Sequence, residues 1–378
     1  GEKKLLAQVE EVYDKIVVVL NIGGVIDLSW IKRDDKIGAA LYGGQGGMEG
    51  GTAMAQVLCG LVNPSGKLAE TIPFSEKDTP AWRYFAPPND DVEYRESIFV
   101  GYRYYETFHV PVKYPFGYGL SYTSFSYSEL NVPEVYSGGK IQIRFKIKNI
   151  GKVSGAEIAQ LYICPIESDV IRSHIELKGF QKIYLHPGEE KEVILELDER
   201  SFSVYDVEKK AFSMLSGKYQ ICIRASVHDL QLKANMEVVG NSYFRNEREL
   251  FPDYFREQPH GMEISAEQFY QLLGGEPKHD KEKKRGEYTV YDSYQDVVNV
   301  SMFGKIVRGV VHIGLKIILR GKSERDPAFK MVKMGVEEGN LEGLIATSGG
   351  IATPKLIDML VYNANKKYLQ AFKRLLKK

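Results

Sequence analysis

Two polar side chains lie in the most glycine-rich stretch of the chain. Gln45 and Glu49 belong to the loop at 42–51, which holds six glycines between Gly43 and Gly51. An amide can hydrogen-bond a polar substrate, and a carboxylate can also move a proton or attack a carbon. Gln45 and Glu49 are therefore the candidate substrate-binding residues, whereas Gly50 and Gly51 are expected to serve the backbone geometry of the loop.

A nucleotide-binding function for this loop is disfavoured. The run Gly44-Gln45-Gly46-Gly47-Met48-Glu49 does not place G-x-G-x-x-G directly after the first strand, and it has no Gly-Lys-Ser/Thr ending. The simpler interpretation is tight packing of a strand against the helix that follows it. We predict no cofactor.

Composition excludes several classes of function. The chain has 378 residues, and 50 Lys and Arg balance 50 Asp and Glu, so no overall basic field would attract nucleic acid. Cys59, Cys164 and Cys222 are widely spaced, which predicts buried thiols and no metal site. Gly1 opens directly into a helical pattern without Met or a signal peptide, so we expect a cytoplasmic protein whose chain begins within a longer one.

The first third of the chain has an α/β pattern. A helix carrying Leu5, Val9 and Val12 precedes the apolar run 16–22, a further helix is expected at 26–31, and a strand is expected at 37–41. The glycine-rich loop then leads into a helix at 52–59, an Asn-Pro-Ser-Gly turn and another strand. An aromatic-rich segment follows from 74 to 125. We expect residues 1–125 to form a partial α/β domain, with the loop at the carboxyl end of a strand.

From residue 126 the hydrophobic period changes to two. Ile141, Ile143, Phe145 and Ile147 alternate with polar residues, and the same alternation recurs near 193–197 and 232–238 between turn signals. This pattern predicts a β-sandwich over 126–240.

Residues 241–378 are expected to form a linker and a helical C-terminal extension. The charged run 281–285 suggests a solvated linker, and a helix at 300–320 carries one basic stripe: Lys305, Arg308, His312, Lys316 and Arg320. Residues 304–378 hold 15 Lys and Arg against 6 Asp and Glu, a local net charge of +9. A membrane-surface role is possible in principle, but we favour a helix that packs its apolar side and solvates its charges.

The last helical pattern has a clear start. Thr353 is an N-cap candidate with Pro354 at the first helical position, and apolar residues from Ile357 to Leu375 are expected to trace one continuous face.

The order of several motifs resembles glycoside hydrolase family 3. The α/β part contains Val17–Gly23, Gly44–Gly51, Val62–Leu68, Thr71–Pro73, Ile98–Tyr105 and Tyr114–Phe125, and the sandwich contains Asn149–Gly151, Gly155–Glu157, Gln160–Tyr162 and Leu177–Phe180. The first group resembles the second domain of the family, and the second group resembles its fibronectin type III-like domain. The resemblance covers residues 5–240, and the closing helices resemble an extension of some bacterial members.

This resemblance implies a retaining β-glucosidase-like enzyme that acts on a β-glucoside or oligosaccharide substrate. Such chemistry needs two carboxyl groups about 5 Å apart. In the family the nucleophilic Asp lies on an N-terminal (β/α)8 barrel and the acid/base Glu lies upstream of the strand that matches Val17–Ile22. No catalytic residue therefore carries over to this chain, and the missing barrel of the same protein is its expected partner. Glu49 matches a glycine-rich structural loop instead, although this loop has two more residues than the family usually has.

Two alternatives stay open at this stage. Tyr94, Arg95 and Glu96 could contact the barrel near the sugar-binding subsite, but we favour a buried ion pair that fixes the aromatic segment. The whole chain could also be a non-catalytic carbohydrate-binding or protein-interaction scaffold, since a fold does not determine a function.

Overall fold

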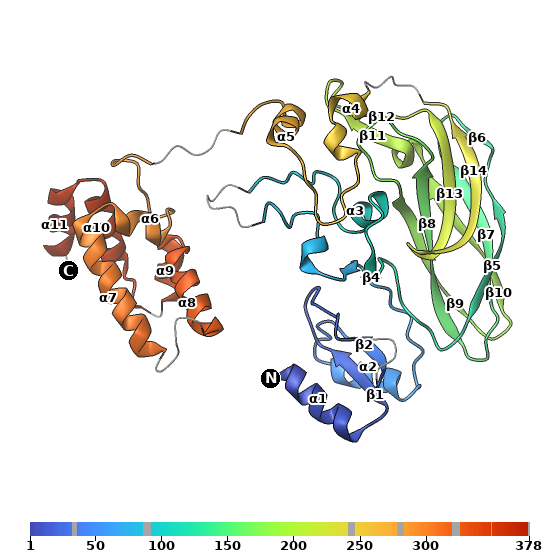
Figure 1. The fold of residues 1–378 in the computed structure, drawn as a ribbon, viewed down its shortest axis with the longest axis horizontal. Coiled ribbons are helices and arrows are strands. Elements are labelled where there is room, and N and C mark those ends of the chain that lie inside the picture. The colour runs from blue at the N-terminus through green and yellow to red at the C-terminus, as the bar shows by residue number, and fades with distance from the viewer. Residues whose placement is uncertain are drawn as a thin grey trace. The chain divides into compact units, whose positions relative to one another are not determined.

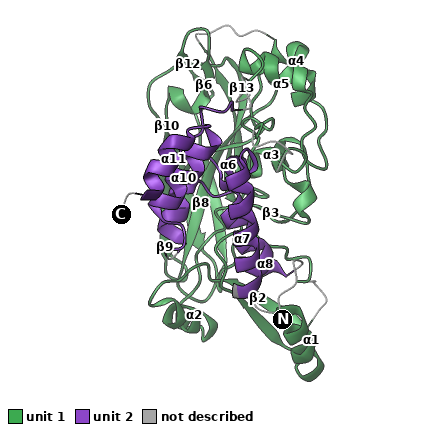
Figure 2. Ribbon diagram, turned by 90° about the vertical axis from the view of Figure 1, so that its left-hand side faces the viewer, with its two compact units in different colours: residues 1–277 green, residues 278–378 purple. Residues whose placement is uncertain are grey.

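The structure is a computed structural model that describes residues 1–31, 36–85, 92–240, 246–277, 283–319, 326–348 and 350–376. The chain folds as two units, residues 1–277 and 278–378 (Figure 2). Unit 1 contains the α/β part, the aromatic segment and the β-sandwich, and unit 2 is helical (Figure 1).

The α/β part begins with helix α1 (Glu2–Val12) and two parallel strands, β1 (Ile16–Leu20) and β2 (Ile37–Tyr42). Helix α2 (Gly50–Leu58) follows the glycine-rich loop. Ile16, Leu20 and Ile37 form a core with Ile72. The predicted order of strand, loop and helix is therefore confirmed for this part.

The helix expected at 26–31 is wrong. Residues 29 and 30 form a turn and the rest of 26–31 is irregular, because the Asp27 carboxylate accepts the Ser29 backbone N–H at 2.8 Å and the Trp30 indole donates to the Asp27 carbonyl at 2.8 Å. Such local side-chain bonds compete with helix formation. Leu28 and Ile31 are still buried in the core. The apolar pattern therefore predicted their burial correctly but the backbone conformation wrongly.

The strand expected after the Asn-Pro-Ser-Gly turn is present but short. It is β3 (Ile72–Pro73), which pairs antiparallel with β4 (Val112–Tyr114). Leu68 exchanges single backbone hydrogen bonds with the aromatic segment, to Tyr118 and from Gly117, both at 2.8 Å.

The aromatic segment packs against chain that follows the sandwich. It contains the 3-10 turn η1 (Glu76–Asp78) and helix α3 (Tyr102–Thr107), and its partner segment contains α4 (Glu247–Leu250), η3 (Pro252–Tyr254) and α5 (Ala266–Leu273). The buried Tyr104 hydroxyl donates to the Gln258 carbonyl at 2.6 Å and accepts the Gly261 N–H at 3.0 Å. The chain consequently divides after Pro277, whereas the expected linker started at 241.

The sandwich has two main sheets. One has the order β10-β7-β5, and the other has the order β6-β14-β13-β8-β9. A short hairpin, β11 with β12, follows the turn η2 (Glu199–Phe202). The strands are β5 (Phe125–Asn131), β6 (Val135–Tyr136), β7 (Ile141–Asn149), β8 (Gly155–Pro165), β9 (Glu176–Leu185), β10 (Glu190–Leu197), β11 (Ser203–Asp206), β12 (Ala211–Met214), β13 (Gly217–Ser226) and β14 (Asp229–Val238).

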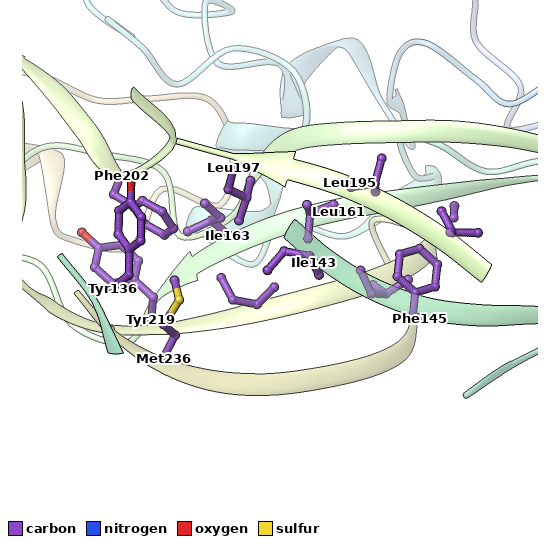
Figure 3. Packing of buried hydrophobic residues seen from close by; sticks show 14 of the residues in the cluster. Tyr136, Ile143, Phe145, Leu161, Ile163, Leu195, Leu197, Phe202, Tyr219 and Met236 are labelled. Atoms are coloured by element: carbon purple, nitrogen blue, oxygen red, sulfur yellow. The ribbon is translucent and has the colours of Figure 1, made fainter. Parts of the chain in front are cut away.

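The alternating residues fill the space between these sheets. Ile143, Phe145 and Ile147 of β7 are buried and lie with Leu161 and Leu195 in one core (Figure 3). The period-two prediction is confirmed, because the polar residues between them are exposed or half-buried.

Asn149 ties the end of β7 to its neighbours. Its side chain is fully buried; Nδ2 donates to the carbonyls of Val153 (2.9 Å) and Leu185 (3.0 Å), and Oδ1 accepts from Thr123 (2.7 Å) and from the Gly151 N–H (3.0 Å). One amide therefore satisfies four polar groups from three segments, as buried polar groups require.

The α/β part meets the sandwich through a largely buried ion pair. Lys67 Nζ lies 3.0 Å from Glu157 Oε1, and the two side chains are 12% and 7% exposed. Lys67 also donates to the Gly119 carbonyl at 3.0 Å, and Asn63 Nδ2 donates to the Ser154 carbonyl at 3.1 Å. Three polar contacts within one junction therefore fix how the sandwich is joined to the α/β part.

The cysteine prediction is wrong for one of the three. Cys222 is buried and Cys164 is partly buried, with their sulfur atoms 3.8 Å apart, but Cys59 is exposed at the end of α2. The apolar residues around Cys59 suggested that it is buried. However, Gly50 is the only buried residue of α2, so this helix is largely exposed.

Unit 2 is a bundle of helices around an apolar core. The core includes Val297, Val298, Leu341, Ile357 and Leu360. The helices are α6 (Tyr294–Asn299), α7 (Met302–Ile318), α8 (Pro327–Glu337), α9 (Leu341–Thr347), α10 (Pro354–Ala364) and α11 (Tyr368–Leu376). Among the described residues, none of the helices has the length and apolar character to span a membrane.

Two expectations about unit 2 need correction. The continuous face from Ile357 to Leu375 is broken after Asn365, because Lys366 has φ +57° and starts a new helix direction. The charged run is not simply solvated: Lys283 pairs with Asp292, and Arg285 donates to the Val300 carbonyl. Residues 281 and 282 of that run lie outside the described part of the chain. Thr353 is confirmed as the N-cap of α10, accepting the Leu356 N–H.

We predict that Glu157→Gln and Lys67→Met each lower the free energy of unfolding of unit 1 by about 3 kcal/mol, because each leaves one charge in a mostly dry junction. The double variant K67M/E157L is expected to melt above both single variants, since no charge then lacks its partner. Calorimetric melting of the three variants checks this. A double variant destabilised by the sum of the single effects would contradict it.

Asn149→Ala is expected to destabilise unit 1 by about 3 kcal/mol, because it leaves two carbonyls and one N–H of the junction without their partner. Asn235→Ala, at an exposed position of β14, is the matched control and is expected to change stability by less than about 0.5 kcal/mol. Thermal melting followed by circular dichroism compares the two. Equal effects of the two substitutions would show that the Asn149 hydrogen bonds add nothing to the stability of unit 1 beyond helix and strand propensity.

Candidate functional site

The two predicted site residues lie beyond the carboxyl ends of the parallel strands. Strands β1 and β2 end at Leu20 and Tyr42, which pair with each other, so the loops that follow begin at one edge. A Cβ atom on Gly23 would lie 2.9 Å from Gln45 Nε2. The Gln45 side chain therefore reaches across to the loop after β1, and the structure brings these two loops together.

The glycines of the loop pack it against α2. A Cβ on Gly43 would lie 2.5 Å from the Met54 side chain, and one on Gly46 would lie 2.8 Å from the Gly50 Cα. Gly44 and Gly47 have φ values of +57° and +65°. This supports the strand-to-helix packing interpretation, since no side chain larger than glycine fits these positions without a shift.

The geometric role assigned to Gly51 is wrong. A Cβ there would meet no atom within 4 Å, and Gly51 has an ordinary negative φ. Gly50 is constrained indirectly, because its Cα lies under Gly46.

Glu49 occupies the N-cap position of α2 and is exposed to solvent. Its side chain makes no capping hydrogen bond with the helix. The carboxylate can therefore meet a ligand from solvent, but the loop does not lock its orientation. Gln45 and Glu49 could hydrogen-bond sugar hydroxyls; neither is arranged here as half of a paired acid and nucleophile.

Sequence reasoning missed a polar pair next to this loop. The Tyr42 hydroxyl donates to Glu70 Oε1 at 2.9 Å, and this bond, assisted by burial, raises the pKa of Tyr42. The Tyr42 ring also lies beside Gly44, where a Cβ would be 3.9 Å from it. A tyrosine at the last position of the strand that leads into a candidate loop was the available signal.

The polar cluster of the aromatic segment contains a structural ion pair, but the acidic partner of Arg95 differs from the expected one. Arg95 pairs with Glu93 at 2.5 Å, lies 4.7 Å above the Tyr84 ring and donates to the Ile264 carbonyl at 2.9 Å. Glu96 is 5% exposed, and its burial raises the pKa of its carboxyl. The favoured ion pair exists, but with Glu93 in place of Glu96. Tyr94 points to solvent with 71% of its surface exposed.

No metal centre is apparent in the described part of the chain, where no group of three or more His, Cys, Asp or Glu side chains could hold an ion.

Two domain families match the chain. Residues 1–122 match the glycosyl hydrolase family 3 C-terminal domain, and residues 157–227 match the fibronectin type III-like domain. These ranges coincide with the α/β part plus the aromatic segment and with the central strands of the sandwich.

Known proteins resemble the same part of the chain. The thermostable beta-glucosidase B of Acetivibrio thermocellus is 44% identical over 240 residues, 63% of this chain and 31% of that protein. An exo-alpha-(1->6)-L-arabinopyranosidase of Bifidobacterium breve is 37% identical over 238 residues, with 63% and 31% covered. The structure of beta-glucosidase 3B from Thermotoga neapolitana with alpha-D-glucose superposes with a TM-score of 0.59 at 36% identity, covering 64% of this chain and 34% of that one.

The chain thus spans 31% of the length of these two relatives. The sequence motifs, the two domain matches and the superposed structure agree on one assignment. Residues 1–122 carry the C-terminal domain of glycoside hydrolase family 3, and residues 157–227 carry a fibronectin type III-like domain.

Proposed function

We propose that this chain is the C-terminal part of a retaining β-glucosidase-like hydrolase that releases terminal non-reducing β-linked sugars. The observation that carries the proposal is the 44% identity to a β-glucosidase over 240 residues. The hydrolase family is established by the domain matches, and the substrate and the stereochemical course are the proposed steps.

The nucleophile would then come from an N-terminal barrel of the same protein, and the acid/base Glu from a segment upstream of the strand that matches Val17–Ile22. Retention of configuration requires a nucleophile and an acid/base about 5 Å apart. In the described residues, the sheets contain two, three or five strands, and none is a closed eight-stranded parallel barrel. Glu49 is an exposed N-cap residue, which supports a role at the rim of a sugar site and not at its reacting centre.

The sugar itself is expected to be selected mainly by that barrel. A β-glucosidase and an arabinopyranosidase resemble this same part of the chain, with 44% and 37% identity. The shared C-terminal part therefore supports more than one sugar. Gln45 and Glu49 would adjust affinity by hydrogen bonds to hydroxyl groups.

A non-catalytic carbohydrate-binding scaffold is the second candidate. Phe180 and Tyr184, four residues apart on β9, are 66% and 55% exposed. Exposed aromatic rings are surfaces on which sugars stack. Calorimetric titration of the chain with cellobiose, compared with Phe180→Ala, distinguishes the candidates: saturable binding that F180A removes would favour the scaffold.

We predict that the purified 378-residue chain hydrolyses p-nitrophenyl β-glucoside at the rate of buffer alone, and that Glu49→Gln and the control Glu76→Gln leave that rate unchanged. A chromogenic assay measures this. Turnover that E49Q abolishes and E76Q does not would make Glu49 catalytic and overturn the proposal. For the native polypeptide we expect β-glucosidase activity and an intact mass above 42.8 kDa.

A further inference from the structure

Unit 2 contains a pocket of about 400 Å³ that is lined by residues of α6, α7 and α8. Four of its lining residues are basic: Lys305, Arg308 and His312 from α7, and Lys333 from α8. One lining carboxylate, Glu337, lies 3.8 Å from Lys333. With His312 neutral, the formal charge of the lining is +2, so the pocket suits an anion.

The basic stripe of α7 contributes three of the residues that line this pocket. Lys305, Arg308 and His312 follow one another at steps of three and four residues, which puts them on one face of the helix. Lys305 and Arg308 are exposed to solvent, as expected of the stripe, and His312 is half-buried; all three also line the pocket. Arg320 of the stripe lies outside the described residues.

A buried hydroxyl adds a second, independent feature. Tyr294, the first residue of α6, lines the pocket and is only 4% exposed, and its hydroxyl has no hydrogen-bond partner among the described residues. Burial raises its pKa to about 12, so it stays protonated and can donate. A buried donor without an acceptor costs free energy, which an anionic oxygen in the pocket would recover.

The remaining walls are apolar. Val311, Leu315 and Val336 line the pocket beside the charged groups. A volume of 400 Å³ lies within the range of small-molecule sites, about 300–1,000 Å³, and exceeds what a bare inorganic ion occupies. The ligand should therefore have an anionic head and an organic body.

We propose that this pocket binds a phosphate monoester. The dianion matches the +2 lining, with its oxygens accepting from Lys305, Arg308 and the Tyr294 hydroxyl, and its organic group lies against Val311 and Leu315. Arg308 donates to Asn299 at 2.7 Å, which orients the guanidinium with one of its five N–H groups. A carboxylate or sulfonate, with a single charge, would fit this lining less well.

Two sources could supply such a headgroup, a soluble organic phosphate or an anionic phospholipid. The lipid source has some support on α7 itself. Its apolar residues Met302, Ile306, Val310, Ile313 and Ile317 are 59–82% exposed and form a stripe beside the basic one. Such an apolar stripe flanked by basic side chains can lie on an anionic lipid surface.

The test is calorimetric titration of the full chain with phenyl phosphate. We expect saturable binding with one site, a dissociation constant raised about tenfold by Arg308→Gln and about fivefold by Tyr294→Phe. Lys330→Gln removes the same charge from an exposed position of α8 that does not line the pocket, and it should leave binding unchanged. Benzenesulfonate should bind more weakly than phenyl phosphate.

Absence of saturable phenyl phosphate binding, or binding that R308Q and Y294F do not weaken while circular dichroism shows them folded, would overturn the proposal. Equal weakening by R308Q and K330Q would also overturn it, because only general charge would then be involved. Sedimentation with phosphatidylcholine vesicles containing phosphatidic acid separates the sources. Vesicle binding that phenyl phosphate displaces assigns the lipid headgroup, and phenyl phosphate binding without vesicle binding assigns a soluble ligand.

Discussion

Unit 1 depends on the ion pair between Lys67 and Glu157. Lys67 follows the Asn-Pro-Ser-Gly turn of the α/β part and Glu157 begins a central strand of the sandwich, and their charged atoms meet at 3.0 Å with little exposure. A pair in such surroundings offsets its desolvation only when its other donors are used, as Lys67 does with the Gly119 carbonyl. Its geometry therefore constrains three segments at once: the turn, the aromatic segment and the sandwich.

Several of the motifs that identify the family meet at this same junction. Asn63 accepts from Ser121 and from the Tyr122 N–H, while Gln160 donates to the carbonyls of Gly117 and Ala225. Gly117 has φ +77°, and a Cβ there would lie 2.3 Å from the Gln160 side chain. These residues are constrained by buried polar contacts between domains, which explains why the chain can be assigned to a hydrolase family through residues that perform no chemistry.

The sequence predicted what depends on local periodicity and missed what depends on partners. The alternation of β7 and the N-cap at Thr353 were readable because neighbouring residues determine them. The turn at 26–31 was not, since the Asp27 side chain outcompetes a helical pattern. The expected ion pair of Arg95 is with Glu93, two residues away, and not with the adjacent Glu96. Its contacts with Tyr84 and Ile264 could not be predicted, because only tertiary packing brings them together.

The two candidate sites differ in the same way. Gln45 and Glu49 attract notice in the sequence because glycines surround them, yet those glycines are explained by contacts with Met54 and Gly50. The basic stripe of α7 looked like an ordinary solvated face, yet three of its residues line a pocket with residues of α6 and α8, beside the buried Tyr294. A buried polar side chain indicates a binding site when it has no hydrogen-bond partner within the protein. Whether such a partner is present depends on how the helices pack together, not on their individual sequences.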